Sequence, residues 1–456
     1  MKPHPILRDI GTLLKYWSFC LLAPVAIAAI YGEIKLLREF VFAFFLVFVL
    51  GMALSSIFSC KETATRLNEG LVIVALFWLV MTFIGSLFFY RNLDITFLDA
   101  FFESMSSWTT TGLTVLNPET LPKTLVFWRS FGQWIGGLGI VVLALGGLFK
   151  TSSSLYIVEG RSERIRPNLL HSINAMWWLY ALYTLIGLIF LIIFGMHWFD
   201  AINHAMTALS TGGMSTKAAS IAAFNSLNIE IVLIVLMIIG NISFFTHYHL
   251  IAGETKRFLK NIQNQALFIM IIIATLLVAS TYSFRSTIFH VISAISTGYQ
   301  IESLVNWSGF TKAILIILMI IGGTLGSTAG GLKLNRVIVL FKSLFLQIMK
   351  FMSPKKVFSR KIGNVLYEDK DVKAVFNYIA VYLLILLVSA AVFMFIGHSP
   401  VDSLFQVASA QGNIGLSVIS NFTVLEKTIL MFNMWIGRLE IWSVLILIIY
   451  LVKRRF

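Results

Sequence analysis

The sequence Thr109-Thr110-Thr111-Gly112 is a short hydroxyl-and-glycine element between apolar segments, and related elements occur three more times along the chain. These are Ser210-Thr211-Gly212, Ser296-Thr297-Gly298 and the more divergent Gly412-Asn413-Ile414-Gly415. A cation that is held by backbone carbonyls in a selectivity filter needs four such elements around one axis. One chain that carries all four elements has the parts to build the whole ring by itself.

The composition indicates a membrane protein. Of the 456 residues, 58% are hydrophobic and only 12% are charged, and the mean hydropathy is +0.87. A helix needs about 20 apolar residues to cross a bilayer. We expect ten such spans, near residues 13–32, 40–59, 70–90, 122–149, 175–196, 227–251, 264–283, 310–346, 372–397 and 424–452. The first segment lacks a small-residue cleavage motif and is followed by another span, so we interpret it as a span and not as a signal peptide.

The net charge of +14 is distributed by topology. Basic residues gather in alternate loops, at 61–66, 150–166, 256–260, 333–373 and 453–455, and near the N-terminus. The positive-inside rule makes these loops and both termini cytoplasmic, so the charge does not indicate nucleic-acid binding. The intervening loops carry Asp94, Asp99, Glu103, Glu119, Asp200, Glu302, Asp402 and Glu426. An acidic outer face would concentrate cations, although topology alone explains the basic half.

The chain repeats one plan after residue 68: an apolar span, a shorter segment, a glycine element and a second span. Internal repeats of this kind define a fold. We predict an all-α membrane protein of ten transmembrane helices, with four repeated units around one pore. The repeats are expected at 69–171, 172–261, 262–371 and 372–456, and residues 1–68 form an extra N-terminal pair of helices.

The shorter segments predict half-helices that point at the glycine elements. Their expected N-cap residues, of types that favour this position, lie 12 or 13 residues before the glycines and are Asp99, Asp200, Ser286 and Asp402. A helix of about 11 residues is roughly 16 Å long and cannot cross a bilayer. Its C-terminal carbonyls carry partial negative charge, which favours a nearby cation. The alternative is that Asp and Ser are simply common at the starts of helices.

The glycine elements themselves suit the lining of a pore. Glycine adopts unusual dihedral angles at the least cost, and non-helical backbone at membrane depth is tolerated only where it is buried in protein or lines water. The alternative is four extracellular turns. The apolar segments that precede the elements, such as 95–102, favour the pore, because a solvated turn needs no such approach.

Four stretches carry a family resemblance: SMSSWTTTG at 104–112, FWRSFGQWIGGLG at 127–139, STGGMS at 210–215 and GGTLGSTAGGLK at 322–333. With these motifs the chain resembles the Trk/Ktr/HKT superfamily of potassium transporters over its entire length, and most closely the Trk-type membrane subunit. The extra N-terminal pair of spans is also similar to the Trk type, because the Ktr type has eight spans.

The resemblance implies potassium uptake across a bacterial or archaeal cytoplasmic (inner) membrane, by a homodimer with one pore in each protomer and a cytosolic nucleotide-binding regulatory ring. The potassium filter would consist of Thr110, Thr111, Gly112, Ser210, Thr211, Gly212, Ser296, Thr297, Gly298, Asn413, Ile414 and Gly415. Potassium would be the bound metal, with no covalent cofactor. The fourth element departs most from the pattern. None of the four is Thr-Val-Gly-Tyr-Gly, so we expect weaker discrimination of potassium over sodium and passage of rubidium.

A glycine-rich segment interrupts the predicted span 310–346, which is too long for one straight crossing. It contains Gly322, Gly323, Gly326, Gly330 and Gly331 and ends at Lys333. Each glycine costs about 1 kcal/mol of helix stability relative to alanine, so we expect a broken helix with a mobile loop below the filter. The resemblance supports a gate there. Close helix packing through small residues is the alternative, and Lys333 either anchors the loop or only reaches the interface.

Charged and polar side chains within the spans are further candidates. Arg438 lies in the last span, where a charge is costly and tends to be functional or paired. The resemblance places it under the filter, facing the pore, where it would limit leak; the alternative is an ion pair with Glu440 or a neighbouring protomer. Arg129 and Gln133 lie one turn apart and are expected to brace the pore helices.

The sequence does not predict an enzyme. It contains no acid–base pair, nucleophile constellation or phosphate-binding loop, so we expect nucleotide binding on the partner subunit, docked on basic inner loops such as 350–373. Cys20 and Cys60 suggest neither a disulfide framework nor a zinc site. The nearer alternative function is a symporter that couples potassium to sodium or protons through broken helices. The more distant one is a membrane enzyme acting on lipid-linked substrates.

Overall fold

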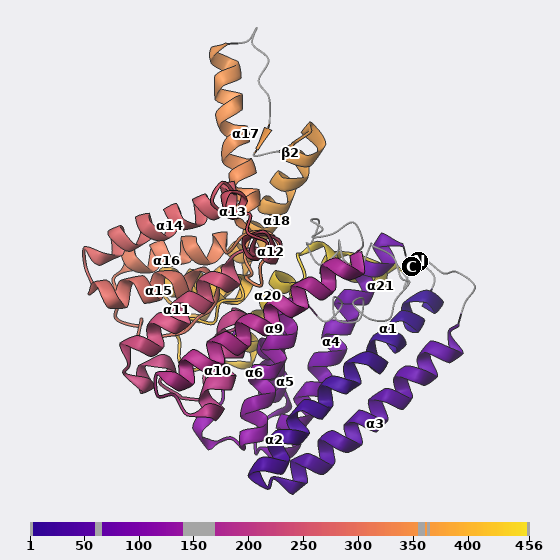
Figure 1. Ribbon diagram of the computed structural model, residues 1–456. Coiled ribbons are helices and arrows are strands. Elements are labelled where there is room, and N and C mark those ends of the chain that lie inside the picture. Colours follow the sequence, from indigo (N-terminus) through magenta and orange to yellow (C-terminus); the bar gives the residue numbers. More distant parts are fainter. Residues whose placement is uncertain (1–2, 60–65, 140–168, 354–360, 363–364, 454–456) are drawn as a thin grey trace.

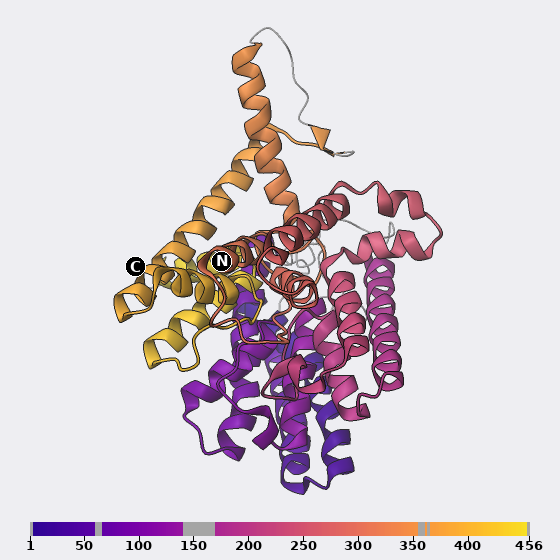
Figure 2. The same cartoon turned by 90° about the vertical axis from the view of Figure 1, so that its left-hand side faces the viewer.

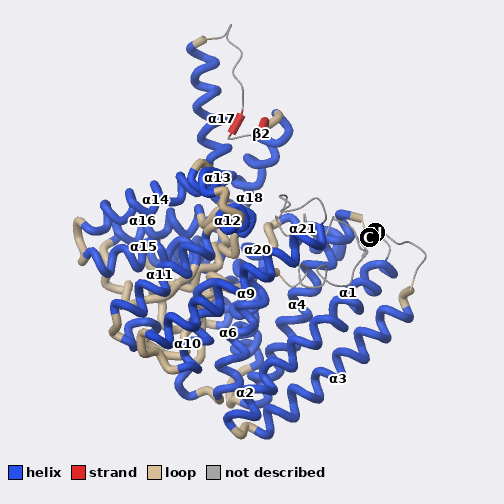
Figure 3. Tube along the Cα trace, in the orientation of Figure 1, coloured by secondary structure: helices blue, strands red, loops and turns tan. Residues whose placement is uncertain are grey.

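The computed structural model describes residues 3–59, 66–139, 169–353, 361–362 and 365–453. Cys60, the basic residues at 150–166, Lys355, Lys356, Arg360 and the end of the expected span 122–149 lie outside these residues. The described chain is almost entirely helical, as predicted (Figure 3). Its one hairpin pairs β1 (Lys361–Ile362) with β2 (Val365–Leu366) in antiparallel register.

The N-terminal residues form a helical hairpin. Its first arm runs through α1 (Pro3–Trp17), a 3-10 turn (Ser18–Leu22) and α2 (Ala23–Tyr31), and its second arm is α3 (Ile34–Ile57). The arms cross closely because a glycine of each arm faces the backbone of the other: a Cβ added at Gly11 would lie 2.7 Å from the nitrogen of Ser55, and one at Gly51 would lie 2.6 Å from the nitrogen of Lys15. Small residues allow such crossings between membrane helices.

The rest of the chain repeats one unit four times. Each unit has a long first helix, a pore helix of 12 or 13 residues, a loop and a second helix. The first unit comprises α4 (Leu67–Asn92), α5 (Phe97–Trp108) and α6 (Lys123–Leu138), and the second comprises α9 (Leu169–Ile193), α10 (Trp198–Leu209), α11 (Leu227–Asn241) and α12 (Phe244–Ile251). After the linking α13 (Thr255–Leu259), the third comprises α14 (Ile262–Ala279), α15 (Phe284–Ser296), α16 (Gly309–Ile321) and α17 (Leu334–Met352). The fourth comprises α18 (Asp369–Ile396), α19 (Pro400–Gln411), α20 (Val424–Arg438) and α21 (Trp442–Lys453), and short 3-10 turns lie at Pro118–Thr120 and Ser220–Phe224.

The second helix is broken in repeats two, three and four, whereas the sequence predicted a break only in the third. The expected spans 227–251 and 424–452 are each bent in the middle: α11 and α12 meet at 107°, and α20 and α21 meet at 113°. The second bend passes through Glu440 and Ile441, which both have positive φ. Among the described residues, six single helices are long and apolar enough to span a membrane, or eight if each bent pair is one span, so the count of ten is not confirmed.

Contacts at the N-terminal ends of the pore helices close the four repeats into a circle. In each case a side chain from the first turn of a pore helix meets the second helix of the preceding repeat. Three contacts are ion pairs: Asp99–Lys427 at 2.5 Å, Asp402–Lys312 at 2.8 Å and Arg285–Glu230 at 2.6 Å. The fourth is a cation–π contact, with Lys123 Nζ 5.3 Å from the ring centre of Phe199. The first repeat therefore joins the fourth as well as the second.

Buried aromatic rings fix the N-terminal hairpin to the first repeat. The ring of Trp108 in α5 packs edge-on against Trp17 at 5.6 Å and against Trp128 at 5.5 Å. Phe40 of α3 stacks on Phe88 of α4 at 4.0 Å. Such pairs contribute about 0.5–1.5 kcal/mol each beyond their area burial. The pore helix of the first repeat is thus held from behind by the hairpin.

Helix α17 extends away from the helical body, and α18 returns from the same projection (Figures 1 and 2). Its outer side chains are apolar and exposed, with Phe345 at 57% and Phe351 at 79%. The projection follows directly after the glycine-rich segment 322–333. Any displacement of α17 would therefore act on that segment.

Candidate ion-conduction site

The four pore helices begin three residues earlier than predicted. The side chains that cap them belong to Thr96, His197, Ser283 and Ser399. The predicted caps Asp99, Asp200, Ser286 and Asp402 are instead the third residue of each helix. Acidic residues in the first turn still stabilise a helix through its dipole, and the Thr96 hydroxyl lies 2.7 Å from the Asp99 carboxylate. The expected ends hold, because each helix stops at its glycine element.

The four glycine elements meet in a closed ring. A Cβ added at any ring glycine would overlap a backbone carbonyl oxygen of the next repeat: Gly112 faces Gly212, Gly213 faces Thr297, Gly298 faces Ile414, and Gly415 faces Thr111. All four ring glycines also have positive φ, between 72° and 99°, a region that glycine alone adopts freely. Each loop contacts the next and the last contacts the first, so the loops surround one axis.

The second element is offset by one residue from the prediction. Thr110, Thr211 and Asn413 share a φ of 54–57°, and each is followed two residues later by a ring glycine. The equivalent of Gly112 is therefore Gly213 and not Gly212. Ser210 is the C-cap of α10, as Thr109 is of α5. Ser210 is therefore equivalent to Thr109 and not to Thr110, with which the sequence had paired it. In the third element, Ser296, Thr297 and Gly298 keep the expected order.

Side chains from neighbouring repeats hold the ring in place. Gln133 Nε2 donates to the Gly212 carbonyl at 2.7 Å, and its Oε1 accepts from the Met214 amide at 3.1 Å. Asn413 Nδ2 donates to the Thr111 hydroxyl at 3.0 Å, which links the fourth element to the first. Gln133 thus braces the backbone of the second element, whereas the sequence predicted a brace between pore helices. Asn413, the residue that departs from the pattern, itself holds the fourth element to the first.

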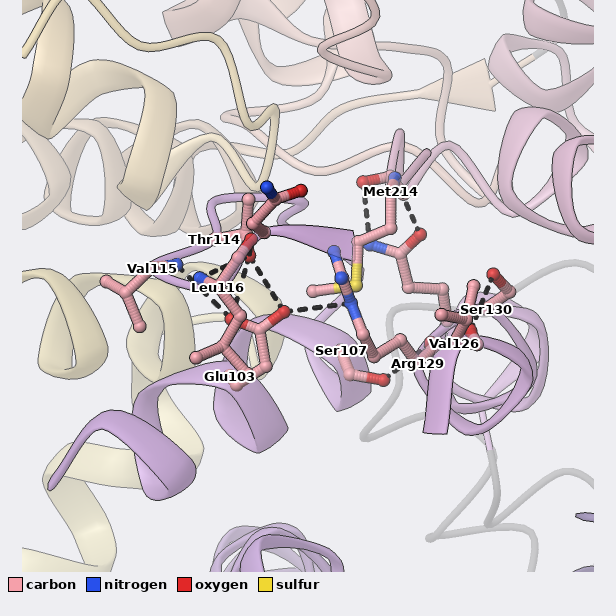
Figure 4. A network of polar contacts seen from close by, with 12 residues as sticks. Glu103, Ser107, Thr114, Val115, Leu116, Val126, Arg129, Ser130 and Met214 are labelled. Atoms are coloured by element: carbon pink, nitrogen blue, oxygen red, sulfur yellow. Dashed lines mark hydrogen bonds and ion pairs between the residues drawn. The ribbon is translucent and has the colours of Figure 1, made fainter. Parts of the chain in front are cut away.

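A buried ion pair lies behind the first element (Figure 4). Arg129 Nε is 2.8 Å from Glu103 Oε1, and both side chains are at most 2% exposed. Glu103 also accepts from the Thr114 hydroxyl at 2.9 Å and from the Val115 amide at 3.3 Å. The assignment of Glu103 to an acidic outer loop is therefore wrong. The composition of the segment could not reveal it, because the partner lies 26 residues further on.

Removing one member of this pair should strongly destabilise the protein. We expect Glu103→Ala to cost about 3–5 kcal/mol, because it leaves the Arg129 guanidinium buried without its counter-charge. The thermal midpoint of the purified protein in detergent measures this effect. The double variant Glu103→Leu/Arg129→Leu is the matched control and should recover most of the loss. An unchanged midpoint in Glu103→Ala would show that the pair does not support the fold.

Cavities lie on both sides of the ring. The outer one has a volume of about 630 Å³ and is lined by all four ring glycines, together with Lys217 and Glu302. The inner one, of about 50 Å³, is lined by the glycine-rich segment and by Lys333 and Arg438. Arg438 contacts Thr110, two residues before Gly112. The first element therefore runs from the side of the inner cavity to the outer one.

The glycine-rich segment 322–333, hereafter the intramembrane loop, separates α16 from α17 as predicted. The Thr328 hydroxyl contacts two carbonyls of the second repeat, at Leu209 (3.0 Å) and Gly240 (2.9 Å). A Cβ added at Gly330 would overlap the carbonyl oxygen of Gly412, so the loop also packs against the fourth element. Gly322, Gly326 and Gly331 provide positive φ, and Gly323 packs against Asn241. The loop thus touches the end of the second pore helix and the fourth glycine element.

Arg438 ties the intramembrane loop to the first repeat. It donates to the Thr328 carbonyl at 2.8 Å, to the Thr110 hydroxyl at 3.2 Å and to the Gly137 carbonyl at 2.8 Å, and it also contacts the Gly136 carbonyl. The alternative partner Glu440 instead contacts Arg336 of α17. Lys333 has a positive φ of 71° and donates to the Ala329 carbonyl within the loop.

The model of the TrkH cation transport protein family matches residues 37–278 and 261–454. The chain belongs to the TrkH family. It is a Trk-type, multi-pass membrane subunit. It is 31% identical to the Trk system potassium uptake protein TrkH of Escherichia coli K12, over 98% of each chain, and 34% identical to an uncharacterized cation transporter of Methanocaldococcus jannaschii, over 97% of this chain and 94% of that one.

A solved TrkH structure has the same fold. The crystal structure of the potassium transporter TrkH from Vibrio parahaemolyticus superposes with a TM-score of 0.87, at 29% identity and with 98% of each chain covered. The predicted architecture of four repeats and an extra N-terminal helix pair is therefore correct for this TrkH family member. The family is one of cation transporters, in agreement with the prediction that the chain is not an enzyme.

Proposed function

We propose that this TrkH family member takes up potassium through the ring of its four glycine elements. The observation that carries the proposal is the closure of the ring, in which every ring glycine packs against a carbonyl of the next repeat. Backbone carbonyls in such a ring replace the hydration shell of the ion. Potassium at these oxygens is the only ligand that the proposal requires, and the uptake named for the Escherichia coli relative supports that ion.

The electrostatics of the site favour a cation without a dedicated carboxylate. Four pore helices end at the ring, and their C-terminal carbonyls carry partial negative charge. Their residues Trp108, Leu209, Ser296 and Gln411 are fully or almost fully buried, so little solvent screens the dipoles. The outer cavity is lined by both Glu302 and Lys217, so these two charges offset each other. We expect rubidium to pass and sodium to be discriminated only moderately.

The intramembrane loop and Arg438 form the proposed gate. The loop packs under the filter and its Thr328 carbonyl accepts from Arg438, which places a positive charge beside the narrow inner cavity. In this state the charge raises the barrier to cations. Displacement of α17, which continues from the loop, would release it. Lys333, which contacts the Ala329 carbonyl, ends the loop where α17 begins.

We place the protein in a bacterial or archaeal cytoplasmic membrane, with both termini inside, as a homodimer that binds a cytosolic nucleotide-binding ring. The proposed docking surface is the basic loop 350–373. Neutralising Lys355, Lys356, Arg360 and Lys361 should abolish co-purification with the regulatory ring, because docking would rest on their charges. Neutralising Lys256, Arg257 and Lys260 in another basic segment is the matched control. Retained co-purification of the first variant would contradict this docking surface.

Growth of a potassium-uptake-deficient bacterium tests the function. Expression of the chain should restore growth on limiting potassium, and a protein present in the membrane without restored growth would contradict the proposal. The alternative is coupled entry with sodium or protons, supported by the broken second helices. Flux in liposomes separates the two, because a symporter moves both ions in a fixed ratio and a channel does not.

A further inference from the structure

Each pore helix carries one buried polar side chain at the same position. It is the seventh residue of the helix in all four repeats: Glu103 in α5, His204 in α10, His290 in α15 and Gln406 in α19. All four side chains are 0% exposed. A polar group in such a place costs free energy unless it is hydrogen-bonded. Four buried polar side chains of three residue types at one equivalent position therefore call for a common partner.

The common partner is the strand that leaves the filter on the outer side. In three repeats it is the hydroxyl two residues beyond the ring glycine: Thr114 lies 2.9 Å from Glu103, Ser215 lies 2.9 Å from His204 Nε2, and Ser417 lies 2.8 Å from Gln406 Oε1. In the third repeat, which has no hydroxyl there, the Ile301 amide donates to His290 Nε2 at 3.3 Å. The contact is thus preserved although the residues differ.

All four side chains act as acceptors in this contact. Nδ1 of His204 faces the Asp200 carbonyl at 2.7 Å, and Nδ1 of His290 faces the Ser286 carbonyl at 2.9 Å. A carbonyl only accepts, so the assigned tautomer has its proton on Nδ1 and a free lone pair on Nε2. Glutamate and glutamine supply an oxygen in the same place. The chemistry required of the position is one acceptor aimed at the outer strand.

The outer strand in turn is shaped by the hydroxyl that it presents. Thr114 accepts from the Leu116 amide at 3.1 Å, Ser215 from the Lys217 amide at 3.0 Å and Ser417 from the Ile419 amide at 3.3 Å. One hydroxyl therefore fixes the turn above the ring and binds it to the pore helix. Since the ring glycine is two residues away, the same contact restrains the last carbonyls of the filter.

We propose that the seventh residue of each pore helix is a positioning residue for ion selectivity, which holds the outer strand so that the filter carbonyls keep their spacing. This inference rests on the proposed function and names the residues that set the discrimination between potassium and sodium. A filter whose outer strand is free can close around the smaller sodium ion, whereas a restrained strand leaves the carbonyls at the distance that suits potassium.

The fourth repeat offers the sharpest test, because its contact is a single hydrogen bond between Gln406 and Ser417 without a charge. We expect Gln406→Leu and Ser417→Ala each to lower the ratio of potassium to sodium flux roughly two- to tenfold, the effect of one hydrogen bond. The purified full chain in liposomes is the material for the measurement. The double variant should be no worse than Ser417→Ala alone, since Ser417→Ala already removes the bond to Gln406 together with the bond from the Ile419 amide.

Two further variants separate positioning from general damage. Gln406→His supplies the side chain that the second and third repeats use at this position, and this variant should keep the wild-type ratio of potassium to sodium flux. Ser303→Ala removes a hydroxyl that also lines the outer cavity. Among the described residues this hydroxyl accepts only from the nearby Val305 amide, so the substitution should leave the ratio unchanged. If Gln406→Leu does not fold, Ser417→Ala still tests the inference, because it removes only one hydroxyl group.

Three results would overturn the inference. An unchanged ratio in both Gln406→Leu and Ser417→Ala would do so while leaving potassium uptake intact, and so would an equal loss of both fluxes, which reports only less folded protein. A wild-type protein without potassium flux would remove the proposed function and this inference together. The wild-type measurement thus distinguishes failure of the one from failure of the other.

Discussion

Gly213→Ala should reduce potassium uptake to background while the protein remains in the membrane. Gly213 has a φ of 72°, which costs an L-residue about 1–2 kcal/mol, and an added Cβ would overlap the carbonyl oxygen of Thr297. That oxygen belongs to backbone and not to a flexible side chain, so the ring itself must deform. Rubidium uptake by cells, normalised to the amount of protein, measures the effect.

Gly212→Ala is the matched control one residue earlier. A Cβ there would lie 2.4 Å from Gln133 Cδ, which is a movable side-chain atom, and Gly212 has no positive φ. We expect a partial loss, relieved when Gln133 is also replaced by alanine. If Gly212→Ala abolished transport and Gly213→Ala did not, the ring would contain Gly212, as the spacing of the elements predicted, and the offset would be wrong.

Arg438→Ala should raise potassium flux at least tenfold in the absence of any regulatory partner. The guanidinium holds Thr328 of the intramembrane loop against Thr110 and the end of α6, and bonds to a charged donor contribute about 1.5–3 kcal/mol each. Losing a positive charge beside the inner cavity lowers the barrier further. A tenfold change requires only about 1.4 kcal/mol. Tracer flux into liposomes measures it.

Arg438→Lys separates the effect of the positive charge from that of the hydrogen bonds that hold the intramembrane loop, hereafter the latch. Lysine keeps the positive charge but lacks the planar fork that reaches several carbonyls at once. Flux that rises as far as in the alanine variant would assign the effect to the latch, and flux that stays near wild type would assign it to the charge. Unchanged flux in Arg438→Ala itself would contradict the proposed gate.

Local sequence signals predicted the parts of the fold that are built locally. The glycine elements and their preceding segments gave the four pore helices, and the five glycines of 322–331 gave the intramembrane loop. The helix starts were missed because His197 is an uncommon cap and because the acidic third residue was mistaken for the cap itself. The cap and the third residue of a helix can be told apart only when the first turn of the helix is known residue by residue.

Contacts between repeats escaped prediction. The offset in the second element arises because two glycines, Gly212 and Gly213, stand side by side, and the spacing alone does not show which of them belongs to the ring. The contact of Gly213 with the Thr297 carbonyl shows that it is Gly213. The bend after Arg438 contains no proline or glycine that would predict it, although Glu440 and Ile441 both have positive φ. The buried pair of Glu103 with Arg129 joins two helices of the first repeat, and the pattern of neither helix alone shows which charge meets which.

Anomalous diffraction from crystals of the protein soaked in rubidium tests the central claim most directly. The ring of Gly112, Gly213, Gly298 and Gly415 should enclose a rubidium peak on its axis, at contact distance from backbone carbonyl oxygens of all four repeats. Rubidium bound instead at carboxylates elsewhere, with an empty ring, would contradict the account.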